Sequence, residues 1–269
     1  MHDSSICDIY APVVRGTYDE RTRFMRDLLE IMWQRHTCRA AFDPQREIRE
    51  ADMQRILDAA RWAPTAHNMQ NFEIIAVDDK HCLAAISAIQ LPPTETFIRE
   101  HYHQLSLSEA ELLRSKTGLL ASMFPESWHE AEAAQDESTA VHHTYVGRMI
   151  QKCPLLLVVV HDSRLRAPAS EEDALGLMSL GCVMQNLWLM TESLGISMQI
   201  LSAFGANAVE DRVQRILAIP KHMKIAFAAR LGYPVTVSES YLRVRRRIQD
   251  FTHRNRYSVR EHKIGDGAA

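Results

Sequence analysis

Several motifs that mark common enzyme classes are absent from this chain of 269 residues. It contains neither G-x-G-x-x-G nor G-x-x-x-x-G-K-[ST], so neither of these glycine-rich phosphate loops is encoded. It also lacks G-x-S-x-G and H-E-x-x-H, which argues against a serine hydrolase of the nucleophile-elbow type and against a zinc peptidase. The function has to be sought in other patterns.

Cysteine is also sparse, at five residues, and no two of them form a C-x-x-C pair. An odd number of scattered cysteines disfavours a disulfide scaffold and a thiolate zinc site, so we expect a reducing, cytoplasmic location. The adjacent His142 and His143 have no partners at ligand spacing, so no metal is expected. The N-terminus carries Asp3 and Asp8 and has no apolar run, so no secretory signal is visible there.

The charge balance argues against binding to nucleic acids or to anionic membranes. The net charge is -3, and charged residues make up 24% and hydrophobic residues 46% of the chain, as in ordinary globular proteins. We therefore expect no nucleic-acid partner and no membrane partner. The longest apolar stretch, Leu175 to Leu194, is interrupted by Gln185, Asn186 and Glu192, which is typical of a buried helix rather than a membrane span.

Hydrophobic periodicity predicts a mixture of helices and strands. The strand at 155–160 is continuously apolar, as a central buried strand would be. A polar excursion from Leu91 to Gly147 has a length typical of a lid or binding region. A basic arm runs from Tyr241 to Arg260. Helices are expected at 19–35, 48–62, 175–194 and 209–217, and strands at 72–77, 155–160, 196–201 and 225–231.

Two segments are richer in ligand-binding groups than the rest. Arg35-His36-Thr37-Cys38-Arg39 follows a helix and places two guanidinium groups and a hydroxyl within five residues, which suits a phosphate. Ala63 to Phe72 joins a helix to a strand and is rich in small and amide side chains, which can lie against a flat heterocycle. Taken alone, the first is better explained as a solvated helix end and the second as a connecting loop.

Taken together and in this order, the two segments resemble the FMN-dependent nitroreductase family. That family has Arg-[Arg/His]-Ser-x-[Arg/Lys] near its start, similar to Arg35–Arg39 here, and then Ala-Pro-Ser and Asn-x-Gln-Pro-Trp, similar to Ala63-Pro64-Thr65 and Asn68–Phe72. Asn71 and Phe72 depart from the family's Pro-Trp. The resemblance covers about Arg26 to Tyr257, with further landmarks at Gly181–Leu187, Leu194–Ile196, Leu217–Pro220 and Leu231–Pro234.

The resemblance implies roles for individual residues. The first segment would meet the flavin's pyrimidine edge, ribityl chain and phosphate, and residues 64–66 would line the flavin of the partner subunit. Ser202 and Ala203 would be the catalytic contacts beside flavin N5. Arg246 and Arg247 compete with Arg245 for the place of a C-terminal phosphate-binding arginine. The implied cofactor-binding set is Arg35, His36, Thr37, Arg39, Pro64, Thr65, Ala66, Asn68, Gln70, Arg148, Leu201, Ser202, Ala203 and Arg245.

The resemblance also implies a fold and an assembly. It implies an α+β fold, with a mostly antiparallel central sheet surrounded by helices, in an intertwined homodimer. One nitroreductase-like domain would span residues 1–269. A variable lid is expected at about 91–147 and a C-terminal dimer arm at about 241–260.

The function implied by the resemblance is redox. The expected enzyme is an FMN-dependent oxidoreductase that takes hydride from NADH or NADPH and reduces electron-poor acceptors such as nitroaromatics or quinones by a ping-pong mechanism. Three alternatives stay open. They are a reductive dehalogenase of the same family, a flavin-fragmenting enzyme of the same family, and an FMN-binding module without turnover.

Overall fold

The computed structural model describes residues 28–89, 99–100, 104, 106–123, 147, 150–205, 207–236 and 242–260. The chain divides into two compact units. The first unit combines Met1–Asp79 with Lys152–Val235, and the second combines Lys80–Gln151 with Thr236–Ala269. Each unit is described by itself.

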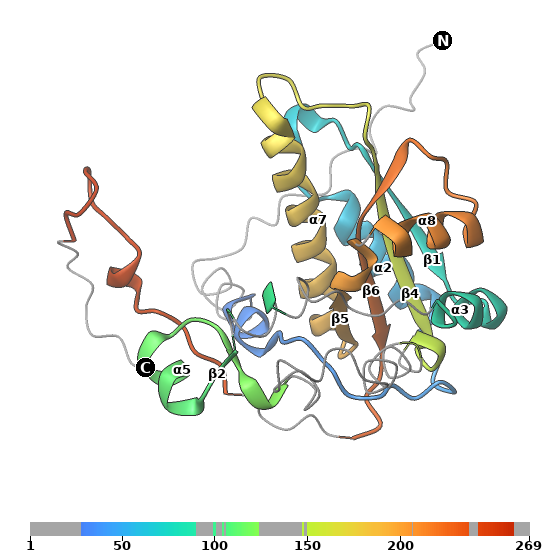
Figure 1. Ribbon diagram of the computed structural model, residues 1–269, viewed down its shortest axis with the longest axis horizontal. Helices are drawn as coiled ribbons and strands as arrows, with labels where there is room; N and C mark the ends of the chain where they lie inside the picture. Colours follow the sequence, from blue (N-terminus) through green and yellow to red (C-terminus); the bar gives the residue numbers. More distant parts are fainter. Residues whose placement is uncertain are drawn as a thin grey trace, which may run out of the picture. The chain divides into compact units, whose positions relative to one another are not determined.

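A four-stranded sheet organises the first unit (Figure 1). Its strands, in spatial order, are β1 (Phe72–Val77), β4 (Leu155–Asp162), β6 (Met223–Gly232) and β5 (Ser197–Leu201), and every neighbouring pair is antiparallel. Strand β4 lies inside the sheet, and residues 155–160 are all buried, which explains their unbroken apolar sequence. The expected α+β fold with an antiparallel sheet is confirmed.

Two helices cover one face of this sheet. They are α2 (Glu50–Arg61) and α7 (Ala174–Ser193), which pack against each other, with α8 (Asn207–Ile216) elsewhere in the unit (Figure 1). The buried side of α7 repeats every three to four residues, as one helix face does. The core that they enclose with the strands contains Ile56, Ala60, Leu155, Leu157, Val159, Val183, Leu187, Met198, Ala229 and Leu231.

The second unit consists of short elements. Among the described residues these are α3 (Lys80–Ser87), α5 (Glu109–Ser115), η3 (Ala121–Met123), η8 (Ile248–Asp250), and the strands β2 (Ser106–Leu107) and β3 (Leu119–Leu120), which pair in parallel. Helix α5 begins with a capping box, in which Ser108 accepts from the Glu111 amide and the Glu111 carboxylate accepts from the Ser108 amide. Part of the expected lid at 91–147 lies outside the described residues.

The predicted elements of the first unit agree with the structure to within a few residues. The strand expected at 72–77 is β1 without change, while those expected at 155–160 and 225–231 extend to Asp162 and to Met223–Gly232. The extensions at 161–162 and 223–224 pair with each other across β4 and β6, and a partner strand is not visible in local periodicity. The helix expected at 19–35 is helical over 28–34 in the described part of the chain.

Candidate functional site

Residues 35–43, here called the edge segment, cross the open edge of β5. The Cys38 amide donates to the Met198 carbonyl at 3.1 Å, on the side of β5 that faces away from β6. At the start of the segment, the Trp188 indole Nε1 on α7 donates to the His36 carbonyl at 3.3 Å. The segment is therefore held at two points by elements that are distant in sequence.

The far end of the edge segment is bound to the turn after β6. The Asp43 amide donates to the Tyr233 carbonyl at 2.8 Å, and the Val235 amide donates to the Ala41 carbonyl at 3.0 Å. Gly232 lies so close to the Phe42 ring that a Cβ at this position would be 2.8 Å from it. Two motifs that the sequence carries far apart, at 35–42 and 231–234, thus form one packed structure.

The side chains of the edge segment differ in exposure. The Cys38 side chain is fully buried, while its neighbours Thr37 and Arg39 are half-exposed. The Arg35 guanidinium lies over the Trp188 ring, 4.3 Å from its centroid, which restrains it by a cation–π contact. The His36 Nδ1 lies 3.1 Å from the Gln34 carbonyl oxygen. The segment therefore carries two guanidinium groups and a hydroxyl on an anchored backbone, which is an arrangement that binds anions.

The α2–β1 loop, residues 64–71, is strained. His67, Asn68 and Gln70 have φ angles of 52°, 51° and 46°. Non-glycine residues in this left-handed region are uncommon, and clusters of them occur preferentially at functional sites. A short 3₁₀ helix, η1 (Ala66–Asn68), forms the centre of this loop.

Hydrogen bonds hold the strained loop in place. The Ala66 amide donates to the Ser179 hydroxyl on α7 at 2.9 Å, and the Gln70 amide donates to the Thr65 hydroxyl at 3.1 Å. The Gln70 side-chain amide donates to the Asn68 side chain at 3.0 Å. The backbone conformation is thus fixed by side chains of the predicted site itself and by one residue of α7.

Asn71 is the last residue of the loop. It stands where the Asn-x-Gln-Pro-Trp motif described above has proline. Its side chain is buried, and its Nδ2 has no hydrogen-bond partner among the residues that the structure describes. A buried amide donor without a partner is costly in the absence of water or a ligand. The loop therefore offers one unused donor.

The predicted N5 contacts follow β5 directly. Leu201 is the last residue of β5 and is buried, and η7 (Ser202–Gly205) begins at the next residue, with Ala203 half-buried. Met198, which accepts the Cys38 amide, lies three residues earlier, or about 10 Å along an extended strand. Strand β5 therefore brings the edge segment and residues 201–203 into one neighbourhood.

Two residues of α7 bind the α2–β1 loop and the edge segment at separate places along the helix. Ser179 holds the α2–β1 loop and Trp188 holds the edge segment, nine residues or about 13 Å apart along the helix.

Arg148 lies outside the described residues.

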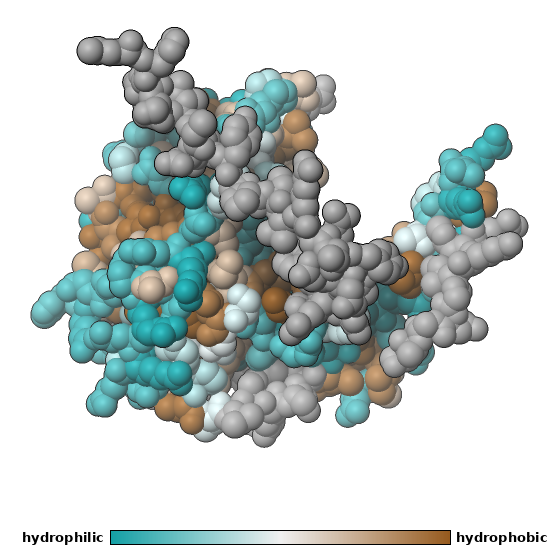
Figure 2. Space-filling model, turned by 180° about the vertical axis from the view of Figure 1, so that it is seen from behind, coloured by the Kyte–Doolittle hydropathy of each residue, from teal (hydrophilic) through white to brown (hydrophobic). Residues whose placement is uncertain are grey.

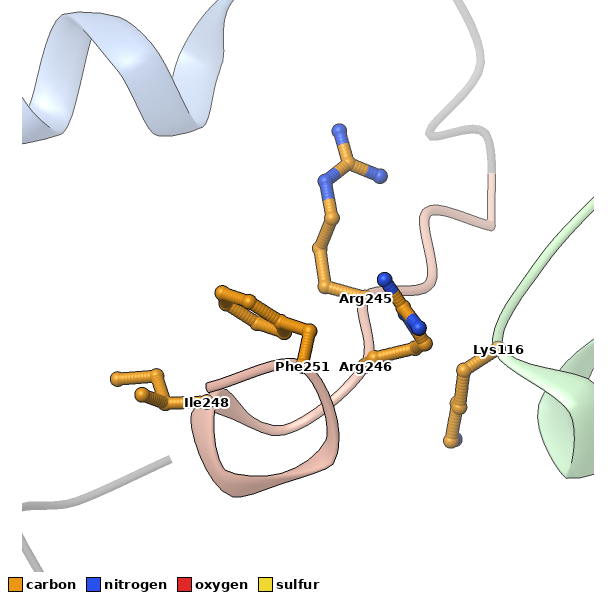
Figure 3. A pocket seen from close by; sticks show the side chains of 5 residues that line it. All are labelled: Lys116, Arg245, Arg246, Ile248 and Phe251. Carbon is orange, nitrogen blue, oxygen red and sulfur yellow. The ribbon is translucent and has the colours of Figure 1, made fainter. Parts of the chain in front are cut away.

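Arg245 belongs to the second unit. It lines a shallow cavity of about 430 Å³ with Lys116, Arg246, Ile248 and Phe251. Figure 3 shows Arg245 and Arg246 leaving the chain in different directions. This cavity is basic on one side and apolar on the other, which suits an anionic group attached to an apolar or aromatic one.

Two of the supporting residues escaped sequence reasoning. Trp188 and Ser179 both lie on α7, which reads from sequence as one apolar helix. Ser179 is a buried polar residue in that helix, and such an interruption is a usable signal for a tether. Trp188 carries no comparable signal, because an aromatic residue in an apolar helix is ordinary.

The buried thiols near the sheet are poor nucleophiles. Burial raises the pKa of Cys153 to about 12, so this thiol stays protonated at neutral pH. The side chain of Cys38 is fully enclosed.

The model of the nitroreductase family matches residues 32–233, which is more than half of the chain. The chain belongs to the nitroreductase family. Its fold is similar to that of an FMN-dependent nitroreductase from Clostridium difficile R20291, at 14% identity and a TM-score of 0.53, covering 85% of this chain and 99% of that one. No curated protein sequence matches the chain.

Iodotyrosine deiodinase, solved with FMN and 3-iodo-L-tyrosine, has a similar fold. It is 17% identical, with a TM-score of 0.54 and coverage of 84% of this chain and 99% of that one. At such identities the likeness concerns the fold. The family assignment and the fold thus agree.

The residues present fit FMN. Thr37 and Arg39 flank buried Cys38 and are half-exposed, so a phosphate dianion can meet a guanidinium and a hydroxyl together. The unused Asn71 Nδ2 is a donor of the kind that a flavin carbonyl accepts. Both observations concern this chain and are independent of the family match.

Proposed function

We propose that the protein is an FMN-dependent oxidoreductase that uses NADH or NADPH to reduce electron-poor acceptors such as nitroaromatics and quinones. The observation that carries the proposal is the edge segment, whose backbone is anchored while Arg35, Thr37 and Arg39 stay half-exposed. When bound, FMN supplies hydride transfer between the nicotinamide and the acceptor.

The chain's own residues supply binding and orientation. Thr37 and Arg39, supported by His36, would hold the phosphate and the ribityl chain. Arg35, restrained by the Trp188 ring, would add positive charge at the flavin's pyrimidine edge, where it stabilises negative charge. Arg148 is proposed for the same edge and Arg245 for the phosphate.

The strained α2–β1 loop is proposed to line the flavin from the partner subunit. Pro64, Thr65 and Ala66 would touch the ring system, and Asn68 and Gln70 would keep the loop in shape through their mutual hydrogen bond. Leu201, Ser202 and Ala203 would lie beside N5, and a backbone N–H of η7 would donate a hydrogen bond to it.

The first experiment tests the cofactor. We expect the purified protein to be yellow, and denaturation to release FMN rather than FAD. Release of FAD, or failure of the apoprotein to take up FMN, would overturn the proposal.

The second experiment tests turnover. Under anaerobic conditions, NADH and NADPH are each added to the FMN-loaded protein, and then a nitroaromatic, a quinone and an iodotyrosine are compared as acceptors. We expect rapid bleaching of the flavin by at least one nicotinamide and recovery of its colour with the first two acceptors. An unbleached flavin would indicate a binding module, and irreversible loss of the flavin would indicate a fragmenting enzyme.

The contact at N5 separates hydride transfer from dehalogenation. A dehalogenase is the second candidate because iodotyrosine deiodinase shares this fold. Ser202→Ala keeps the backbone N–H and removes the hydroxyl, so we expect NAD(P)H oxidation close to that of the unaltered protein. Ser202→Pro removes the N–H, and loss of one positioned donor costs on the order of a hundredfold in rate. Flavin content is measured first in both variants, and abolition of turnover by alanine would favour the dehalogenase.

A homodimer is proposed from the apolar surface of the first unit. On α7, Leu177 and Met178 are 61% and 66% exposed, and Trp33 and Trp62 are also exposed. Figure 2 shows apolar surface gathered in patches, and such patches mark interaction sites. Sedimentation should find a dimer that releases flavin on dilution. A flavin-loaded monomer would contradict this proposal.

Solubility and a cytoplasmic location are proposed with the dimer. Helix α7 is long and apolar enough to cross a membrane by length and composition. Its inner face nevertheless packs into the core with α2 and the sheet, and its outer face suits a subunit interface. Both faces are thereby accounted for without a membrane.

A further inference from the structure

Arg230 is the largest fully buried side chain in the part of the chain that the structure describes, with no exposed surface. It lies within β6, on the sheet face opposite to that of Ala229 and Leu231, because side chains alternate along a strand. Enclosing a guanidinium inside a protein carries a large desolvation cost, which hydrogen bonds to the group must offset. The contacts of Arg230 therefore indicate what it holds.

Those contacts converge on the edge segment. The Arg230 Nη2 donates to the Ala40 carbonyl at 2.8 Å and to the Cys38 carbonyl at 3.2 Å, and its guanidinium lies over the Phe42 ring at 4.1 Å. On the other side, the Arg230 Nε donates to the Gln199 side-chain oxygen on β5 at 2.7 Å. One side chain thus joins β6, β5 and three residues of the edge segment.

The two carbonyls that it binds belong to the residues on either side of Arg39. Both carbonyls point toward one nitrogen, the Arg230 Nη2, so one guanidinium binds both. The Cys38 amide is bonded in addition to the Met198 carbonyl. The backbone is therefore held before and after Arg39, and the directions of the Thr37 and Arg39 side chains follow from it.

We propose that Arg230 is a positioning residue that presets Thr37 and Arg39 for the phosphate of the ligand. This proposal rests on the proposed function, since it takes FMN as that ligand. Arginine suits the task because its planar fork reaches the carbonyls and Gln199 at once. A lysine has one flexible point of donation and cannot make all of these bonds.

The test compares FMN with riboflavin, which has the same ring and ribityl chain but no phosphate. Affinities of the apoprotein for both are measured by quenching of flavin fluorescence in the unaltered protein, Arg230→Met and Arg230→Lys. We expect Arg230→Met to reduce the preference for FMN over riboflavin by about tenfold or more, as loss of a well-placed charged hydrogen bond does. Arg230→Lys should fall between the two.

A matched control separates positioning from general loss of stability. Val158→Ala creates a cavity in the neighbouring strand β4, where Val158 is fully buried and pairs with Ala228. It should lower stability but leave the ratio of the two affinities unchanged. If Arg230→Met does not fold, Gln199→Met removes only the bond to the Arg230 Nε and should lower the same ratio to a smaller extent.

Hydrogen exchange of the ligand-free protein gives a readout that does not depend on the cofactor. The Cys38 amide should exchange faster in Arg230→Met than in Val158→Ala, because the segment is released from β5. Equal exchange rates and an unchanged affinity ratio in Arg230→Met would overturn the inference. If the unaltered protein binds neither flavin while the exchange rate of the Cys38 amide still depends on Arg230, the proposed function is wrong. The inference that Arg230 holds the edge segment in place would then remain.

Discussion

Two arginine-rich segments of this chain differ in how they are held. In the edge segment, the backbone around Arg35 and Arg39 is bonded to Trp188, Met198 and Arg230, which belong to α7, β5 and β6. In the C-terminal arm, described over residues 242–260, three arginines contact near neighbours in sequence. Arg245 donates to the Val244 carbonyl, Arg247 pairs with Asp250, and Arg246 lies over Phe251.

The difference shows that arginine content alone does not make a binding site. A guanidinium on an anchored backbone has only side-chain freedom left to lose when it binds an anion. Where the backbone lacks such anchors, binding can also cost backbone freedom, and that cost reduces affinity. We therefore expect the edge segment to dominate recognition of the phosphate, with the arm contributing less.

The largest expected effect compares one arginine from each segment. Arg39→Ala should weaken FMN binding by about 1.5–3 kcal/mol, the usual contribution of a charged hydrogen bond, which is roughly a ten- to hundredfold rise in Kd. Arg245→Ala should raise the Kd by a smaller factor. Calorimetric or fluorescence titration of the apoproteins measures both, with Arg246→Ala as a test of the register in the arm. A larger loss in Arg245→Ala than in Arg39→Ala would reverse the comparison.

A smaller effect concerns the packing that anchors the edge segment. In Gly232→Ala the new Cβ would lie 2.8 Å from the Phe42 ring and from Pro154, so we expect a loss of about 1–3 kcal/mol in stability and weaker FMN binding. Adding Phe42→Leu to Gly232→Ala should recover part of the loss, because the smaller side chain relieves the clash. Urea unfolding of both single variants and the double variant measures this coupling. Strictly additive losses would show that the two residues act separately.

The smallest effect concerns two similar ion pairs, Arg49–Asp52 in the first unit and Arg247–Asp250 in the arm, each spanning three residues. Hydrogen bonds from the paired arginines hold the pKa of both aspartates below its ordinary value. The Asp52 side chain is 2% exposed and that of Asp250 is 32% exposed. Water therefore screens the second pair more, and we expect it to contribute less to stability.

The sign of the pH dependence follows from the lowered pKa values. A carboxyl whose pKa is lower in the folded state stabilises the fold above its unfolded pKa of about 3.9, and that contribution is lost as the pH falls through the folded value. Asp52→Asn should thus be less stable than the unaltered protein at pH 7, with a difference that shrinks below about pH 4. Asp250→Asn should show little difference throughout. Urea unfolding between pH 7 and pH 3 measures both, and equal losses at pH 7 would argue against the comparison.

The sequence by itself determined most of the secondary structure and the family. Alternating or continuous apolar residues marked β1, β4, β5 and β6, because burial on one or two faces of a sheet leaves a local pattern. The order and spacing of the motifs at 35–39, 63–72 and 231–234 indicated the nitroreductase family, which the match over residues 32–233 confirms. Whether the individual site residues contact FMN stays a prediction.

Only the tertiary structure decided how those motifs are supported. The bonds from Trp188 to His36 and from Arg230 to Cys38 join residues 152 and 192 positions apart, and such distances leave no periodic signal in the sequence. The strain of the α2–β1 loop was likewise invisible, because His67, Asn68 and Gln70 are ordinary loop residues until their φ angles are known. Burial of a helix or strand face leaves a periodic pattern in the sequence. Support of one segment by another leaves no such pattern, because it depends on which distant side chains the fold brings together.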